Sequence, residues 1–243
     1  MSLYRSVRAV TGASGNGPVD WGAVGDAARA ATDPGDIDVP TAERAAYADD
    51  VCDARDRIRE VTTLEFDLPA TVEIQSRHHW IGANLATFER VMAPIEARAE
   101  VIPGIARMVN TGSMALALSF LSNNVLGQYD PLLLADGDDH KLYFVRPNIE
   151  RVADSLDVSY PRFRRWIAFH EVTHAAEFGA APWLPSHLET TMQEAVEKLS
   201  AGDIDRTQLG ELDTAMTAIE GYAELVMDEA FDGEYADLRR KLD

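Results

Sequence analysis

The 243-residue chain is strongly acidic: 41 aspartates and glutamates stand against 22 lysines and arginines, which gives a formal net charge of −19. With 46% hydrophobic residues it has enough apolar side chains for a substantial core. We therefore expect residues 41–243 to form a single, mostly helical domain, preceded by a flexible or partly helical N-terminal segment over residues 1–40. The negative charge argues against a nucleic-acid partner and against an anionic membrane surface.

The residue types also indicate the salt and redox environment of the protein. Lys141, Lys198 and Lys241 are its only lysines, and an acidic, lysine-poor surface stays hydrated when salt screens its self-repulsion, as in halophilic proteins. Cys52 is the single cysteine. An internal disulfide is therefore excluded, and we expect Cys52 to be a buried apolar residue.

The chain begins without the apolar region of a signal peptide, and its longest apolar run, Met114 to Leu121, is too short to span a bilayer. A cytoplasmic protein without a membrane partner is expected.

The first half of the chain predicts helices separated by glycine and proline. A short helix is expected over residues 20–31, and a long amphipathic helix begins at Thr41, which we expect to be its N-cap. A short extended segment over 71–75 precedes a helix over 77–91, and a further helix is expected between Pro94 and Pro103.

The second half predicts the most apolar helix and the clearest strand. Residues 112–126 are apolar almost all round, which indicates a core helix, and residues 127–131 read as its stop and a turn. Residues 141–145 form the strand, which could pair with an extended substrate beside the active-site helix. Later helices are expected over 187–199 and 207–231.

The chain is organised around the motif H-E-x-x-H, formed by His170, Glu171 and His174. It lies within an expected helix that begins near Pro161 and ends at Gly179. Residues four apart share one helix face, so the two imidazoles can reach a single Zn²⁺ ion. Glu171 lies beside the first ligand, where it can take a proton from the attacking water. A chance coincidence is the weaker interpretation, because bulky apolar residues flank the motif on both sides.

A third zinc ligand must come from elsewhere in the chain. The metzincin pattern would need histidine at position 180, which is Ala180, whereas the gluzincin pattern takes a glutamate from a later helix. Glu220, Glu224 and Asp228 lie four apart on such a helix and are flanked by apolar residues. We predict Glu220 as the ligand and Glu224 as the acid that orients a ligand histidine, with Asp228 as the alternative acid. A solvated acidic face is the competing interpretation of this stripe.

Several stretches of the chain resemble the DUF2342 family of zincin-like zinc-dependent metalloproteases or hydrolases, one branch of which is associated with coenzyme F420 biosynthesis. Arg77 to Asn84 is similar to the family pattern R-x-x-W-x-x-x-N, and Glu220 to Asp228 is similar to E-G-x-x-D-V-V-M-D, with glutamate at 224. Residues 125–130, 144–148, 170–175 and 182–188 are similar to its other signatures. The resemblance implies a mainly α, zincin-like fold with a minor β element and H-E-x-x-H on a central helix. It supports His170, His174 and Glu220 as ligands, with Glu171 as the base.

These observations predict a gluzincin-type zinc metallopeptidase or related hydrolase that cleaves a peptide or small amide substrate. Tyr222 or His187 could donate the hydrogen bond that the developing oxyanion needs. Three alternatives stay open: a catalytically inactive zinc-binding scaffold, a metal hydrolase acting on a cofactor precursor, and a metal-free helical interaction protein.

Overall fold

A computed structural model of the chain describes residues 6, 9–11, 17–35, 37–98, 104–130, 140–200 and 206–242. Within these residues the fold is mainly α with one small sheet, as predicted. The helices are α2 (Trp21–Ala31), α3 (Thr41–Thr62), α4 (Arg77–Arg98), α5 (Gly104–Asn124), α6 (Arg146–Ser155), α7 (Tyr160–Ala180), α8 (Leu184–Ser200), α9 (Arg206–Phe231) and α10 (Ala236–Leu242). The strands are β1 (Thr71–Gln75), β2 (Gly127–Asp130) and β3 (Lys141–Val145).

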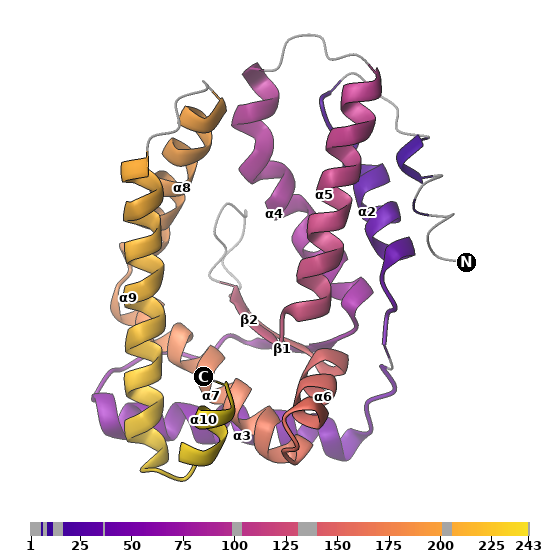
Figure 1. Ribbon diagram of the computed structural model, residues 1–243. Helices are drawn as coiled ribbons and strands as arrows, with labels where there is room; N and C mark the ends of the chain where they lie inside the picture. Colours follow the sequence, from indigo (N-terminus) through magenta and orange to yellow (C-terminus); the bar gives the residue numbers. More distant parts are fainter. Residues whose placement is uncertain are drawn as a thin grey trace.

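Helix α7, which carries the motif, lies at the centre of this arrangement. Helices α3, α6, α7 and α10 form the base of the molecule, α8 and α9 rise on one side, and α2, α4 and α5 rise on the other (Figure 1). Helix α7 packs against α3, α6, α9 and strand β2. Its Phe163, Ile167 and Phe169 are buried in the largest core cluster, so hydrophobic packing fixes the helix rigidly.

The N-terminal residues contribute a packed helix. Asp20 accepts a hydrogen bond from the Ala23 N–H at 2.9 Å and so caps α2, whose Trp21 and Val24 are buried. Helix α2 packs against α5 and α4 and shares a core cluster with them. None of the described helices combines the length and apolar character that crossing a bilayer requires.

The sheet has the order β1-β3-β2, which corrects two expectations. Strand β3 pairs in parallel with β1 and antiparallel with β2, so both of its edges are already hydrogen-bonded and it cannot pair with a substrate. Residues 127–130 form strand β2 rather than a helix stop and turn, because their backbone groups pair with β3. It is β2 that packs against α7.

Several helix boundaries also differ from the expectations. Helix α4 continues through position 94, since a proline weakens a helix by one backbone bond without always ending it. Helix α7 runs through Gly179, and α8 begins at Leu184, earlier than expected. Thr41 is the first residue of α3, and Pro40 holds the cap position.

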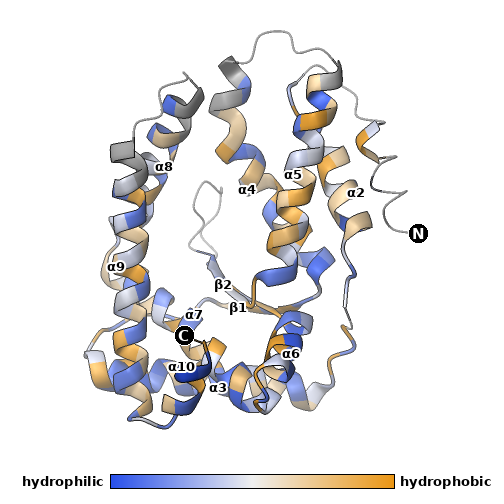
Figure 2. Ribbon diagram, in the orientation of Figure 1, coloured by the Kyte–Doolittle hydropathy of each residue, from blue (hydrophilic) through white to orange (hydrophobic). Residues whose placement is uncertain are grey.

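Two expectations about burial are wrong. Helix α5 is not wholly buried: Leu116 and Phe120 are 69% and 67% exposed, because α2 and α4 cover only part of its apolar surface (Figure 2). Cys52 is exposed. The face of α3 that enters the core is formed by Val51, Ala54 and their neighbours one turn away, and position 52 points away from it.

Candidate metal centre

The two histidines of the motif converge because α7 places them one turn apart. Their Nε2 atoms lie 3.2 Å apart, and their rings are nearly perpendicular. The His170 ring stacks on Trp166 from the preceding turn, with a centroid distance of 5.8 Å. The buried Nδ1 atom of His170 has no hydrogen-bond partner within the described part of the chain. Packing rather than a hydrogen bond therefore orients this imidazole.

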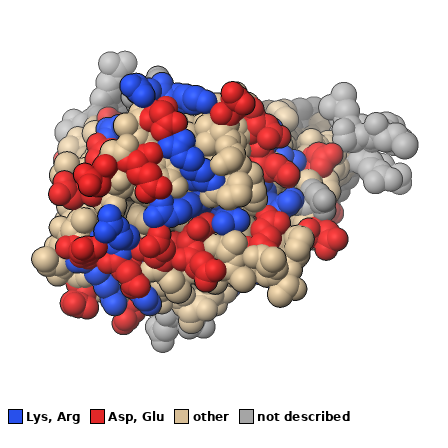
Figure 3. Space-filling model, turned by 90° about the horizontal axis from the view of Figure 1, so that it is seen from below, with Lys and Arg blue, Asp and Glu red and all other residues tan. Residues whose placement is uncertain are grey.

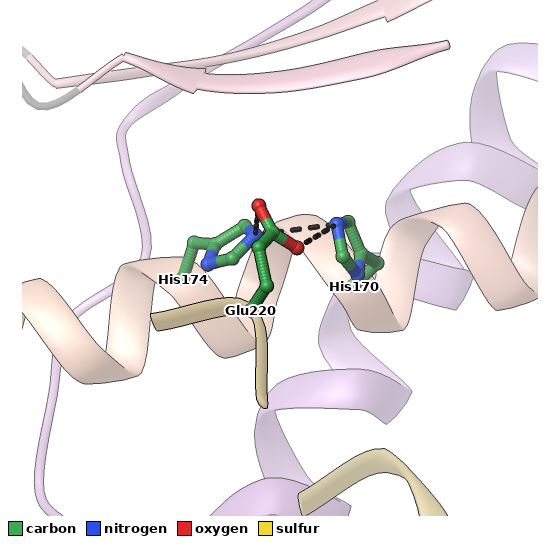
Figure 4. A group of neighbouring side chains, drawn as sticks. All are labelled: His170, His174 and Glu220. Atoms are coloured by element: carbon green, nitrogen blue, oxygen red, sulfur yellow. Dashed lines mark hydrogen bonds and ion pairs between the residues drawn. The ribbon is translucent and has the colours of Figure 1, made fainter. Parts of the chain in front are cut away.

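Glu220 reaches the same point from α9. Its carboxylate oxygens lie 3.6 Å from the Nε2 atom of His170 and 3.8 Å from that of His174, and its side chain is half exposed. The three groups point toward one another across the contact between α7 and α9 (Figure 4). One ligand atom from each residue lies within 4.8 Å of the other two. Among the described residues, this is the group whose geometry could hold a metal ion.

The side chains present fit a zinc ion. Tetrahedral Zn²⁺, with Zn–N bonds of about 2.0–2.1 Å, separates two ligating nitrogens by about 3.3 Å, close to the 3.2 Å found here. The distances from Glu220 are somewhat longer than this, but its exposed side chain has room to adjust. Two imidazoles and one carboxylate are also the donor set of catalytic zinc sites that keep one position for water or substrate.

Glu177 holds the second histidine in place. Its buried carboxylate accepts the Nδ1–H of His174 at 2.7 Å. A proton fixed on Nδ1 leaves the lone pair of Nε2 directed at Glu220, which is the tautomer that a metal ligand needs. Glu177 was not among the predicted site residues, although its position three residues after His174 places both side chains on one helix face.

Glu224 and Asp228 do not orient a ligand histidine, contrary to expectation. Both carboxylates form ion pairs with Arg239 of α10, and the side chains of Glu224 and Asp228 are 64% and 57% exposed. Each step of four residues along α9 carries the side chain away from α7 and toward α10. The acidic stripe is therefore divided between Glu220 beside the histidines and two acids that anchor the last helix.

Glu171 is turned toward the sheet. It is only 6% exposed, and its Oε2 atom accepts the backbone N–H of Tyr129 on β2 at 2.8 Å. Strand β2 can approach this closely because position 127 is glycine: a Cβ atom there would lie 2.5 Å from Oε1 of Glu171. Burial raises the pKa of the Glu171 carboxyl, although the neighbouring imidazoles His170 and His174 lower it.

The other titratable groups of the centre are shifted by one another. Burial raises the pKa of Glu177, and the hydrogen bond from His174 opposes that rise. For His174 itself burial lowers the pKa, but the hydrogen bond to Glu177 and the charges of Glu171, Glu177 and Glu220 raise it, and the net shift is upward. Three carboxylates around two imidazoles thus favour positive charge at the imidazole nitrogens. Either protons supply that charge or a metal ion displaces them.

Tyr222 and His187 lie beside this centre rather than in it. Both line a cavity of about 890 Å³ between α8 and α9, and Glu177 lines it as well. Tyr222 is 39% exposed, and His187 packs against Trp183 at a ring-centroid distance of 5.8 Å. Within the described residues, no hydrogen bond joins either side chain to the two histidines or to Glu220.

Comparison with known proteins shows the family to which the chain belongs. Residues 19–209 match a protein family described as zincin-like metallopeptidase. The chain belongs to this family. The matched residues include His170, Glu171 and His174 and end before Glu220. The comparison with curated proteins gives no match.

One solved structure is similar to this protein along most of the chain. It is the crystal structure of a protein from Chloroflexus aurantiacus described as "a putative hydrolase with a novel fold". The two chains are 27% identical with a TM-score of 0.68, and the similarity covers 94% of this chain and 68% of the other. The likeness therefore extends over nearly the whole fold described above.

A hydrogen-bonded network around β2 supports the candidate metal centre. The Trp80 indole N–H donates to Gln128 at 2.7 Å, and the Gln128 amide donates to Asn84 at 3.0 Å. The buried Asn148 donates to the backbone carbonyls of Ser122 and Val125, just before β2. Side chains far apart in sequence thus hold the strand that contacts Glu171.

Proposed function

We propose that this protein is a zinc-dependent hydrolase that cleaves a peptide or amide bond. His170, His174 and Glu220 would hold the ion. The observation that carries the proposal is the convergence of their ligand atoms from two packed helices, with the Nε2 atoms 3.2 Å apart. Membership of the zincin-like metallopeptidase family and likeness to a described hydrolase support the same reaction class.

Glu171 is proposed as the general base. Zinc, when bound, supplies Lewis acidity that polarises a substrate carbonyl and acidifies a water molecule. The Glu171 carboxylate would accept the proton of that water and pass it to the leaving nitrogen. The Tyr129 N–H holds Oε2 of this carboxylate, so Oε1 is the oxygen left to take the proton. Burial raises the pKa of Glu171, which makes its carboxylate a stronger proton acceptor.

Tyr222 or His187 is proposed to stabilise the oxyanion. Each carries an N–H or O–H donor and lines the cavity next to Glu177. A movement of either side chain toward a bound substrate would bring the donor to the developing negative charge, since catalytic hydrogen bonds often tighten only in the complex.

Metal stoichiometry is the measurement that tests the proposal. We expect about one zinc per chain in the wild type, and its loss in His170→Ala and Glu220→Ala. Glu224→Ala is the matched control, because Glu224 lies one turn further along the same helix and pairs with Arg239. Zinc retained in Glu220→Ala would assign the third ligand elsewhere, and a folded wild type without zinc would overturn the proposal.

The catalytic step is tested separately from metal binding. Glu171→Gln keeps the size of the side chain and removes its basicity, so zinc should remain while turnover of a cleaved peptide falls by about 10²–10⁴-fold. Full activity in this variant would exclude Glu171 as the base. A zinc-loaded wild type that cleaves none of a diverse peptide library would instead favour a metal-binding scaffold without hydrolase activity.

A further inference from the structure

Two cavities lie close to the candidate metal centre. The first, of about 890 Å³, includes Glu177, the partner of His174, and Tyr222, two residues after Glu220. The second, of about 550 Å³, includes His170. Both cavities are therefore candidates for binding parts of a substrate that lies at the three ligand groups.

The two cavities differ in chemistry. The first lies between α8 and α9, and most of its lining is apolar, including Leu64, Leu184 and Ile219. Among the described residues that line it, the charged ones are the acids Glu177 and Glu211, and none is a lysine or an arginine. The second is bounded by aromatic rings and by charges of both signs, which come from two acids of α9 and two arginines of α10.

The apolar surface of the first cavity is open to a ligand. The Trp183 side chain lies in its wall and is 63% exposed, and Tyr222 is 39% exposed. Large apolar side chains exposed around a concave site are typical of surfaces that bind a partner or ligand. Glu177 bonds the Nδ1 atom of His174, and Ile219 precedes Glu220 in α9, so two residues that line this cavity contact or adjoin proposed ligand residues.

We propose that the cavity between α8 and α9 binds an apolar segment of the substrate and selects against acidic residues there. This inference rests on the proposed hydrolase function and names the class of substrate that the site accepts. Its volume of about 890 Å³ lies within the ~300–1,000 Å³ of pockets that enclose a whole small ligand, so it holds more than one side chain. A carboxylate entering it would meet two negative charges and no guanidinium or ammonium group.

The test measures binding to the zinc-loaded Glu171→Gln variant, so that no probe is consumed. The probes are blocked peptides of equal length, rich in leucine and phenylalanine, in serine and asparagine, or in leucine and glutamate. Isothermal titration calorimetry should give at least about ten-fold tighter binding of the first peptide than of the other two, because burial of one bulky apolar side chain accounts for about ten-fold in affinity.

Two matched substitutions locate the binding site. Thr214 lines the cavity, Thr190 lines neither cavity, and both are exposed residues whose hydroxyls bond the carbonyl four residues earlier in their helix. Thr214→Trp should fill the cavity and weaken binding of the apolar peptide by at least about ten-fold, whereas Thr190→Trp should not change it. Thermal unfolding of both variants would verify that they are folded.

The outcomes separate this inference from the proposed function. Selective binding that Thr214→Trp removes would support the apolar subsite even if the wild type cleaves nothing, in which case only the hydrolase proposal fails. Equal or absent binding of the three peptides, or binding unaffected by Thr214→Trp, would overturn the inference even if the wild type is an active peptidase.

Discussion

At the scale of single residues, the distinction between Glu177 and Glu224 shows which acid supports the candidate metal centre. Glu177 is buried and bonded to His174, whereas Glu224 is exposed and paired with Arg239. A carboxylate that bonds a ligand histidine fixes its tautomer and makes the imidazole a better ligand.

Replacing these two acids by glutamine tests that role. Glu177→Gln should weaken zinc binding by about 10–100-fold, the usual cost of losing such a partner, and Glu224→Gln should leave zinc affinity unchanged. Competition with a chelator of known affinity measures both. Equal zinc affinities in the two variants would show that Glu177 does not affect zinc binding by His174.

At the scale of elements, the contact between β2 and α7 positions Glu171, the proposed general base. The Tyr129 N–H orients Glu171, and the missing side chain of Gly127 lets the strand lie against that carboxyl group. This contact belongs to neither element alone, because strand β2 is held in position by its pairing with β3 and by the network of Trp80, Gln128 and Asn84.

A methyl group at position 127 should disturb both stability and catalysis. Gly127→Ala would place a Cβ atom 2.5 Å from Oε1 of Glu171. We therefore expect a loss of about 1–3 kcal/mol in the free energy of unfolding, as in other overpacked cores, together with reduced turnover. Gly210→Ala is the control: it lies in α9 with nothing within 4 Å of the added Cβ, so it should stabilise the protein by about 0.5–1 kcal/mol. Urea unfolding and a peptide-cleavage assay measure the two effects, and unchanged behaviour of Gly127→Ala would contradict the close contact.

At the scale of the whole molecule, the net charge of −19 determines how stability responds to salt. The face seen from below interleaves arginine and lysine with acids (Figure 3). The ion pairs of the described residues include Arg165 with Asp53 and Arg162 with Asp237. The acids in excess of these pairs repel one another wherever they lie on the surface, and dissolved salt screens that repulsion.

We predict that salt stabilises this protein. The thermal unfolding midpoint should rise between low and molar KCl, because screening of the net charge outweighs the weakening of exposed ion pairs, each of which is worth about 0–1 kcal/mol. Differential scanning calorimetry over a KCl series, with NaCl as a second salt, measures the shift. A midpoint that stays constant or falls would contradict the expectation that the protein is adapted to a salt-rich cytoplasm.

The amino-acid sequence by itself determined the features that depend on local spacing. The i, i+4 spacing of His170 and His174 on a helix, and a later helix with Glu220 flanked by apolar residues, follow from the period of the α-helix alone. The mainly helical class and the strand at 141–145 followed from the same periodicity and from β-branched and aromatic side chains.

Only the tertiary structure decided which of several equivalent residues share a contact. Glu220, Glu224 and Asp228 have the same local pattern, and it is the crossing of α9 over α7 that brings one of them to the histidines and leaves the other two to Arg239. Strand β2 was not predicted, because its stability comes from pairing with β3 and not from its own four residues. Contacts between segments distant in sequence depend on how packed elements exclude water and fill space, and local spacing carries no information about that.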